Sequence, residues 1–126
     1  MIKKICIIDD DPILVFTLKY QIDMINSDIE ITLFSNGKEA FDFFSDKTKK
    51  VQFPDIIFLD INMPVWDAWD FLNEWKKYEF ANHSLIYILS SSINPKDSQN
   101  IKKYIFVKSF LTKPINLENL KLILSE

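Results

Sequence analysis

"ICIIDDDPI" (residues 5–13) places four apolar residues directly before three carboxylates and a proline. The run Ile5 to Ile8 is typical of a strand buried on both faces, as in a parallel sheet. Asp11 followed by Pro12 indicates a helix start, with a capping carboxylate and a proline in the first turn. A buried strand that leads into a helix is the unit from which parallel α/β sheets are built.

The rest of the chain repeats this alternation of short apolar runs and amphipathic stretches. We expect further strands at IEITLF (29–34), DIIFLD (55–60), SLIYILSSS (84–92) and SFLTKP (109–114). The apolar stripes of the expected helices are Leu14, Leu18, Ile22 and Ile25; Phe41 and Phe44 after a turn at Asn36-Gly37; Phe71, Leu72, Trp75 and Tyr78; and Leu117, Leu120 and Leu124. A helix begun by Asn94-Pro95 has almost no apolar stripe, so it should be poorly anchored. Five strands alternating with five helices predict one doubly wound parallel α/β sheet.

Composition sets the class of protein. The chain has 126 residues, 48% of them hydrophobic, and a net charge of −3, which suits one globular domain. A nucleic-acid-binding domain would usually show a basic excess, so we expect no direct nucleic-acid contact. The single cysteine, Cys6, cannot form an internal disulfide. Neither a signal peptide nor a spanning segment of about 20 apolar residues occurs, so we expect a cytoplasmic protein without membrane contact.

Polar side chains follow four of the expected strands. Asp9 and Asp10 end the first strand, Asp60 ends the third, Ser90 the fourth and Lys113 the fifth. Because parallel strands end at one edge of the sheet, where ligands bind, these residues should converge. Two like charges about 4 Å apart repel by about 4 kcal/mol at an effective dielectric of about 20. Either the pKa values of the clustered carboxyl groups rise, or a cation lies among them.

An all-oxygen cluster with no His or Cys selects a hard cation, and Mg²⁺ is the natural choice because it binds one or two carboxylates and often a phosphate. A lysine and a hydroxyl directed at the same place can hold phosphoryl oxygens. A carboxylate that attacks phosphorus forms an aspartyl phosphate. The residues therefore predict a metal site that supports phosphoryl transfer onto an aspartate.

The motifs IIDDDP, LDINMPVWDAWDFL, ILSSS and FLTKP, in this order, closely resemble the receiver domain of two-component response regulators. The resemblance covers essentially the whole chain. It implies a flavodoxin-like, five-stranded parallel sheet with the strand order 2-1-3-4-5. It also implies a single receiver domain over residues 1–126, of the chemotaxis type, with no output domain.

The resemblance assigns roles at the acidic site. It implies that Asp60 is the phosphoacceptor, and that Asp10 and Asp60 bind Mg²⁺ directly together with the backbone carbonyl of Asn62. Asp9 would act mainly through water. Lys113 would pair with the phosphoryl oxygens.

The resemblance also implies a switch. The hydroxyl of Ser90 would shift onto the phosphoryl group, and the ring of Phe110 would then turn inward. Asn62 and Ser92 match two positions that tune hydrolysis of the acyl phosphate in this family. The surface that would change on phosphorylation, formed by the fourth helix, fifth strand and fifth helix, carries Lys102 and Lys103 and is expected to meet the output partner.

Two features depart from the family pattern. A glycine that usually follows Asp in the loop beyond "MP" is replaced by Ala68, and FVKS (106–109) stands where a Gly-Ala pair commonly precedes the last strand. Neither change touches the acceptor site. Trp66 lies in the loop beside the acidic residues, whereas Trp69 and Trp75 are expected to pack in the interior.

The leading interpretation is a stand-alone receiver, a signalling module rather than a metabolic enzyme. It would take its phosphoryl group from a histidine kinase or a phosphotransfer protein and act through protein–protein contact. One alternative is a haloacid-dehalogenase-type phosphohydrolase, because Asp9 and Asp11 have its Asp-x-Asp spacing, although Ile13 stands where that family needs Thr or Val. A second alternative is a degenerate receiver that only binds a partner.

Overall fold

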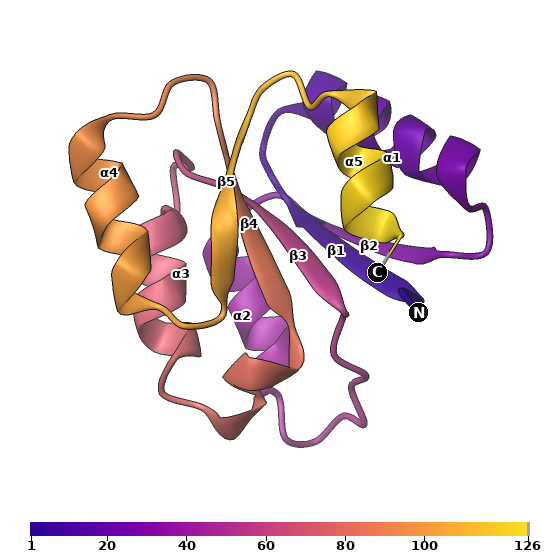
Figure 1. Cartoon of the computed structure of the whole chain (residues 1–126). Helices are drawn as coiled ribbons and strands as arrows, with labels where there is room; N and C mark the ends of the chain where they lie inside the picture. Colours follow the sequence, from indigo (N-terminus) through magenta and orange to yellow (C-terminus); the bar gives the residue numbers. More distant parts are fainter. Residues whose placement is uncertain (126) are drawn as a thin grey trace.

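The computed structural model describes residues 1–125, which form one five-stranded parallel sheet in the order β2-β1-β3-β4-β5 (Figure 1). The strands are β1 (Lys4–Ile8), β2 (Glu30–Phe34), β3 (Ile56–Asp60), β4 (Leu85–Ser90) and β5 (Val107–Thr112). This order confirms the sheet implied by the resemblance. The sheet has β2 and β5 at its two edges, so the strand expected at 29–34 is an edge strand.

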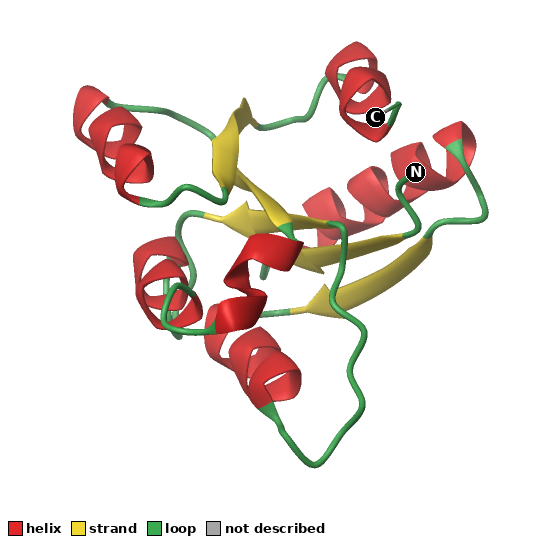
Figure 2. Cartoon of the chain, turned by 60° about the horizontal axis from the view of Figure 1, so that its bottom comes forward, coloured by secondary structure: helices red, strands yellow, loops and turns green. Residues whose placement is uncertain are grey.

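Five α-helices and two short 3₁₀ helices connect the strands. They are α1 (Pro12–Ile25), α2 (Gly37–Ser45), α3 (Ala68–Trp75), η1 (Glu79–His83), α4 (Pro95–Asn100), η2 (Ile101–Lys103) and α5 (Leu117–Leu124). Figures 1 and 2 show α1 and α5 on one side of the sheet and α2, α3 and α4 on the other. Within residues 1–125, no helix is long and apolar enough to cross a membrane.

The core consists of two layers, one on each face of the sheet. Alternate residues of β1 serve different layers: Ile5 and Ile7 pack toward α1 and α5, whereas Cys6 and Ile8 pack toward α2 and α3. All four are buried. This two-sided burial explains why β1 is a continuous apolar run rather than an alternating one.

The structure corrects several predicted boundaries. Strand β4 ends at Ser90 and not at Ser92, and β5 ends at Thr112 and not at Pro114. Helix α3 ends at Trp75, so Tyr78 lies beyond it and is 37% exposed. The N–H of Tyr78 donates to the carbonyl of Trp75 at 3.2 Å, a tight turn that leads into η1. Strand β5 begins at Val107, two residues earlier than expected, because an irregularity opposite Ile86 and Tyr87 interrupts the alternation that marks a strand.

Helix α4 is short and weakly anchored, as predicted. Its Asn94 cap accepts the N–H of Asp97 at 2.8 Å, and Pro95 occupies the first turn. All six of its residues are at least partly exposed. Little apolar burial holds this helix to the sheet, so its local opening should cost little free energy.

Candidate functional site

Three carboxylates meet at the carboxyl edge of the sheet. Asp9 and Asp10 follow β1, and Asp60 is the last residue of β3; one oxygen of each lies within 4.8 Å of the others. Asp9 and Asp60 are only 3% and 5% exposed, whereas Asp10 is open to solvent. The order of the strands places β1 beside β3, which is why residues about 50 positions apart converge.

Lys113 joins this cluster from the end of β5. Its ammonium nitrogen lies 2.9 Å from Asp9 Oδ2 and donates to Asp60 Oδ1 at 3.0 Å. The backbone N–H of Lys113 donates to the carbonyl of Ser90 at 2.9 Å, which extends the β4–β5 pairing by one bond beyond the strand. The structure therefore brings together four residues that the sequence predicts to converge: Asp9, Asp10, Asp60 and Lys113.

The electrostatics of the cluster are unbalanced. Burial raises the pKa of Asp60 from 3.8 to about 6; the hydrogen bond from Lys113 lowers it, and the charge of Asp9 raises it further. Burial alone would lower the pKa of Lys113, but its contacts with Asp9 and Asp60 outweigh this and raise it. One ammonium thus faces three carboxyl groups. Its positive charge does not fully offset the burial of Asp60 and the negative charge of Asp9, so the ionised form of Asp60 is disfavoured.

The donor set fits a hard divalent cation. Every candidate ligand atom of the cluster is a carboxylate oxygen, which Mg²⁺ prefers over softer metals. Asp9 Oδ2 forms an ion pair with Lys113 but accepts no directed hydrogen bond from any of residues 1–125. Asp10 gives the cluster an open side. These residues can therefore hold a metal with a water-filled remainder of its coordination sphere.

Backbone N–H groups near the cluster donate hydrogen bonds to aspartate side chains. The N–H of Asp11 donates to Asp9 Oδ1 at 2.9 Å, and the backbone of Asn62 lowers the pKa of Asp60, although burial outweighs this effect. Asp11 turns its own carboxylate to the N–H groups of Ile13 and Leu14 as the cap of α1. Asp11 is therefore a structural cap, as predicted, and does not join the cluster.

The predicted switch residues lie on β4 and β5, next to the cluster. Ser90 is buried at the end of β4, and its hydroxyl donates to the carbonyl of Ser92; the N–H of Ser92 donates back to Ser90 Oγ at 3.2 Å. Phe110 is half-buried in β5 and packs against the core layer of α2 and α3. The roles of Ser90, Ser92, Asn62 and Phe110 toward a phosphoryl group stay predictions.

Sequence reasoning missed the part played by the segment between β2 and α2. The carbonyl of Phe34 accepts the N–H of Asp9 at 3.1 Å. Gly37 lies against the backbone of Trp66, in the loop that follows Asp60. The sequence offers one signal of this close approach, the single glycine of the chain, but the local pattern at Asn36-Gly37 indicates only a turn. Gly37 is instead the first residue of α2, and Asn36 is its cap.

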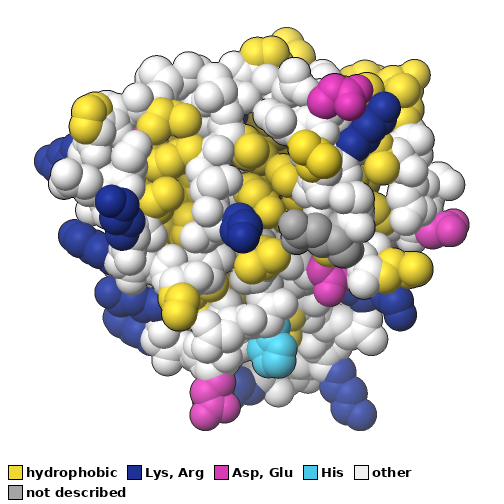
Figure 3. All heavy atoms as spheres, in the orientation of Figure 1, with side chains coloured by type: hydrophobic (Ala, Val, Ile, Leu, Met, Phe, Trp, Pro, Cys, Tyr) yellow, Lys and Arg dark blue, Asp and Glu magenta, His cyan; other side chains and the backbone are white. Residues whose placement is uncertain are grey.

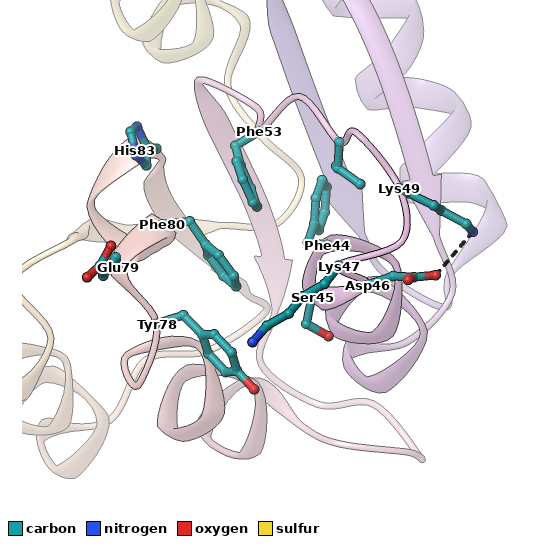
Figure 4. A pocket seen from close by; sticks show the side chains of 11 residues that line it. Phe44, Ser45, Asp46, Lys47, Lys49, Phe53, Tyr78, Glu79, Phe80 and His83 are labelled. Atoms are coloured by element: carbon teal, nitrogen blue, oxygen red, sulfur yellow. Dashed lines mark ion pairs between the residues drawn. The ribbon is translucent and has the colours of Figure 1, made fainter.

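A separate hollow of about 470 Å³ lies at the opposite, amino edge of the sheet (Figure 4). Aromatic side chains from the end of α2, the segment before β3 and the region of η1 line it, among them Phe44, Phe53, Tyr78 and Phe80. Phe53 and Phe80 stack with their ring centroids 4.6 Å apart. This hollow contains none of the clustered carboxylates, so the candidate chemistry belongs to the carboxyl edge.

Comparisons with known proteins agree with this geometry. A family model described as "Response regulator receiver domain" matches residues 5–125. The chain is 38% identical over 82 residues to the peroxide stress-activated histidine kinase mak1 of Schizosaccharomyces pombe. That match covers 63% of this chain and only 5% of the kinase, so the likeness concerns one segment of a much longer protein.

Solved structures show the same fold. The crystal structure of a two component response regulator from Cytophaga hutchinsonii has a TM-score of 0.87 and 28% identity, over 98% of this chain and 95% of that one. The receiver domain of sensor histidine kinase PA1611 from Pseudomonas aeruginosa PAO1, which has a magnesium ion in its active site cleft, has a TM-score of 0.80. Its identity is 21%, over 99% of this chain and 96% of that one, so this likeness concerns the fold alone.

Proposed function

Because the chain belongs to the response regulator receiver domain family, we propose that it accepts a phosphoryl group on Asp60 with the help of Mg²⁺ and signals through a partner protein. The observation that carries this proposal is the position of Asp60: a nearly buried carboxylate at a strand end, with two more carboxylates and the ammonium of Lys113 around it. The module is a signalling domain, and its chemistry is limited to its own phosphorylation and dephosphorylation.

Mg²⁺ would be held by Asp10, Asp60 and the backbone carbonyl of Asn62, with Asp9 acting through water. When bound, the ion neutralises the excess negative charge of the cluster and of an incoming phosphoryl group. Lys113 contributes the second positive charge. Its ammonium already reaches Asp60 Oδ1 at 3.0 Å, so it is within reach of oxygens added to that carboxylate.

The transfer itself is a displacement at phosphorus. A carboxylate oxygen of Asp60 forms a new bond to phosphorus while the bond from phosphorus to the histidine nitrogen of the donor breaks, and the leaving imidazole takes up a proton. Hydrolysis ends the signal: water attacks the phosphorus of the aspartyl phosphate and releases inorganic phosphate and the free carboxylate of Asp60. The ionised form of Asp60 is the nucleophile, so the cation and Lys113 must offset the burial that raises its pKa.

Helix α1 offers a docking surface for the phosphodonor. Four large apolar side chains of this helix are 60–77% exposed: Ile13, Phe16, Tyr20 and Met24. Their spacing of three to four residues puts them on one face of the helix. Exposed apolar stripes of this kind mark interaction sites. The stripe begins next to the acidic residues, and a groove of about 340 Å³ connects α1 with Lys113 and Pro114. A helical surface of a histidine kinase or phosphotransfer protein would fit it.

The output would pass through α4, β5 and α5. Phosphorylation would draw the hydroxyl of Ser90 away from Ser92 and open space for the ring of Phe110, which favours a second arrangement of the weakly anchored α4. Figure 3 shows this face, with apolar side chains between α4 and β5 and lysine side chains around them. Lys102 and Lys103, both exposed, lie in η2 directly after α4.

The two alternatives differ at Asp11 and at the cluster. The phosphohydrolase interpretation needs Asp11 in the site, but its carboxylate caps α1, and the family match points elsewhere. A degenerate receiver would lack part of the acceptor site, and here the acidic residues and Lys113 are all present. The expected cytoplasmic location stays part of this proposal.

Intact-mass spectrometry after incubation with acetyl phosphate tests the proposal, with and without Mg²⁺. We expect one added phosphoryl group on the wild type, lost in Asp60→Asn and lost without Mg²⁺, and retained in the matched control Asp23→Asn on the exposed side of α1. A modification that survives Asp60→Asn and disappears in Asp9→Asn would favour the phosphohydrolase. No modification of a folded chain would favour the degenerate receiver.

A further inference from the structure

Trp66 has an unusual backbone conformation in the loop between β3 and α3. Its φ is 55°, and it is the one non-glycine residue among residues 1–125 with a positive φ. A bulky side chain in this left-handed region costs free energy, so neighbouring structure must hold it there. Strained residues of this kind tend to occur near functional sites. Here the strain lies six positions after Asp60.

Gly37 makes room for this conformation. A Cβ atom at Gly37 would lie 3.0 Å from the backbone oxygen of Trp66 and 3.2 Å from Cβ of Phe71. The nearest obstacle is backbone and not the end of a flexible side chain, so it cannot move aside freely. The φ of Gly37 is not positive, so its need for glycine comes from this close approach and not from its own backbone. It is also the only glycine of the chain.

The first two turns of α2 hold the Trp66 side chain as well. The ring of Phe41 packs against the indole with centroids 5.3 Å apart, and the ammonium of Lys38 lies 5.5 Å from the indole centroid. Lys38 is itself held by Asp42 at 3.1 Å. The backbone at Gly37, the ring of Phe41 and the charge of Lys38 all belong to α2, and together they hold Trp66 in place.

The same segment also touches the other ligand-bearing loop. We call residues 34–41 the β2–α2 corner. At its start, the carbonyl of Phe34 accepts the N–H of Asp9; at its end, Gly37 and Phe41 contact Trp66. The N–H of Ala68 donates to the carbonyl of Ile61 at 3.2 Å and closes the loop that carries both Asn62 and Trp66.

We propose that the β2–α2 corner is a positioning element of the metal site, with Gly37 and Trp66 as positioning residues that hold the Asn62 carbonyl relative to Asp60. This inference rests on the proposed function, because it concerns the same cation. The corner supplies no ligand. It sets the spacing of the two loops that supply the ligands. Residues behind the ligands play the same part in other metal sites.

The test is Mg²⁺ affinity by isothermal titration calorimetry on folded chains, together with urea unfolding in EDTA. Gly37→Ala adds the obstructing Cβ, and Trp66→Ala removes the ring while keeping a Cβ at the left-handed position. We expect each to weaken Mg²⁺ binding by about 10-fold, a usual size for residues behind metal ligands. Trp66→Phe keeps a ring on Phe41 and should stay close to wild type. Ser45→Ala, at the far end of α2, is the matched control and should bind as wild type.

A purely structural role predicts a different pattern. In that case the variants change the urea midpoint in EDTA, but those that fold bind Mg²⁺ like wild type, and this result would overturn the inference. If Gly37→Ala does not fold, the comparison of Trp66→Ala with Trp66→Phe decides alone. A wild-type chain that binds no Mg²⁺ would overturn the metal site itself, whereas wild-type binding with unaffected variants would overturn only the role of the corner.

Discussion

Asp60→Asn should stabilise the protein in the absence of metal, although it destroys the proposed phosphoacceptor. The pKa of Asp60 is raised from 3.8 to about 6 in the folded chain, first by burial. A carboxyl group with a raised folded pKa favours the folded state when protonated, so stability is lost as the pH rises from about 4 through about 6. At pH 7 the wild type has lost all of this contribution, whereas asparagine carries no charge to lose.

The magnitude follows from the same shift. A difference of about two pKa units corresponds to about 3 kcal/mol of unfolding free energy at pH 7. This is an upper bound, because asparagine gives up the charged partner of Lys113; we expect a gain of about 1–3 kcal/mol. At about pH 4.5 most of the wild-type Asp60 is protonated, and the calculated difference falls to about 1 kcal/mol or less.

Urea unfolding in EDTA at these two pH values measures the gain, with Asp23→Asn on the exposed face of α1 as the control expected to change stability by less than about 0.5 kcal/mol. Added Mg²⁺ should stabilise the wild type by mass action and narrow its difference from Asp60→Asn. The reasoning is refuted if Asp60→Asn lowers stability at pH 7 in EDTA, or if its effect is the same at both pH values.

Three further predictions concern other parts of the molecule. Lys113→Met should lower the unfolding free energy by about 2–4 kcal/mol at pH 7, because it leaves Asp9 and Asp60 without their cation; a neutral effect by urea unfolding would contradict the ion-pair geometry. Phe16→Ser with Tyr20→Ser should change stability by about 0.5 kcal/mol or less and leave labelling by acetyl phosphate intact, yet slow phosphotransfer from a cognate donor protein; equal transfer rates would exclude α1 as the docking surface. Phe71→Ala should cost about 3–5 kcal/mol by urea unfolding, because this side chain is fully buried between α3 and the sheet, and a cost under about 1 kcal/mol would contradict that packing.

Much of this architecture can be predicted from local patterns. The continuous apolar runs of β1 and β3 follow from burial on both faces, and the Asp11-Pro12 and Asn94-Pro95 pairs mark helix starts by their chemistry. The convergence of Asp60 and Lys113 follows because parallel strands end at one edge of the sheet. These features depend on residues close in sequence or on a general property of the fold.

The remaining features depend on tertiary contacts that no local pattern records. Tyr78 continues the helical spacing of α3, but the chain turns at Trp75. The irregularity in the β4–β5 pairing disrupts the alternation near Lys108, so the start of β5 is hidden. The role of Gly37 comes from a backbone atom of Trp66, 29 positions away, and a glycine followed by a charged residue resembles an ordinary turn.

The most direct test of the central claim is to locate the phosphoryl group after labelling with acetyl phosphate and Mg²⁺. Borohydride reduces an aspartyl phosphate to homoserine, and tandem mass spectrometry of tryptic peptides then identifies the modified position. The proposed mechanism predicts homoserine at position 60 alone. Homoserine at position 9, 10 or 11, with Asp60 unmodified, would contradict it.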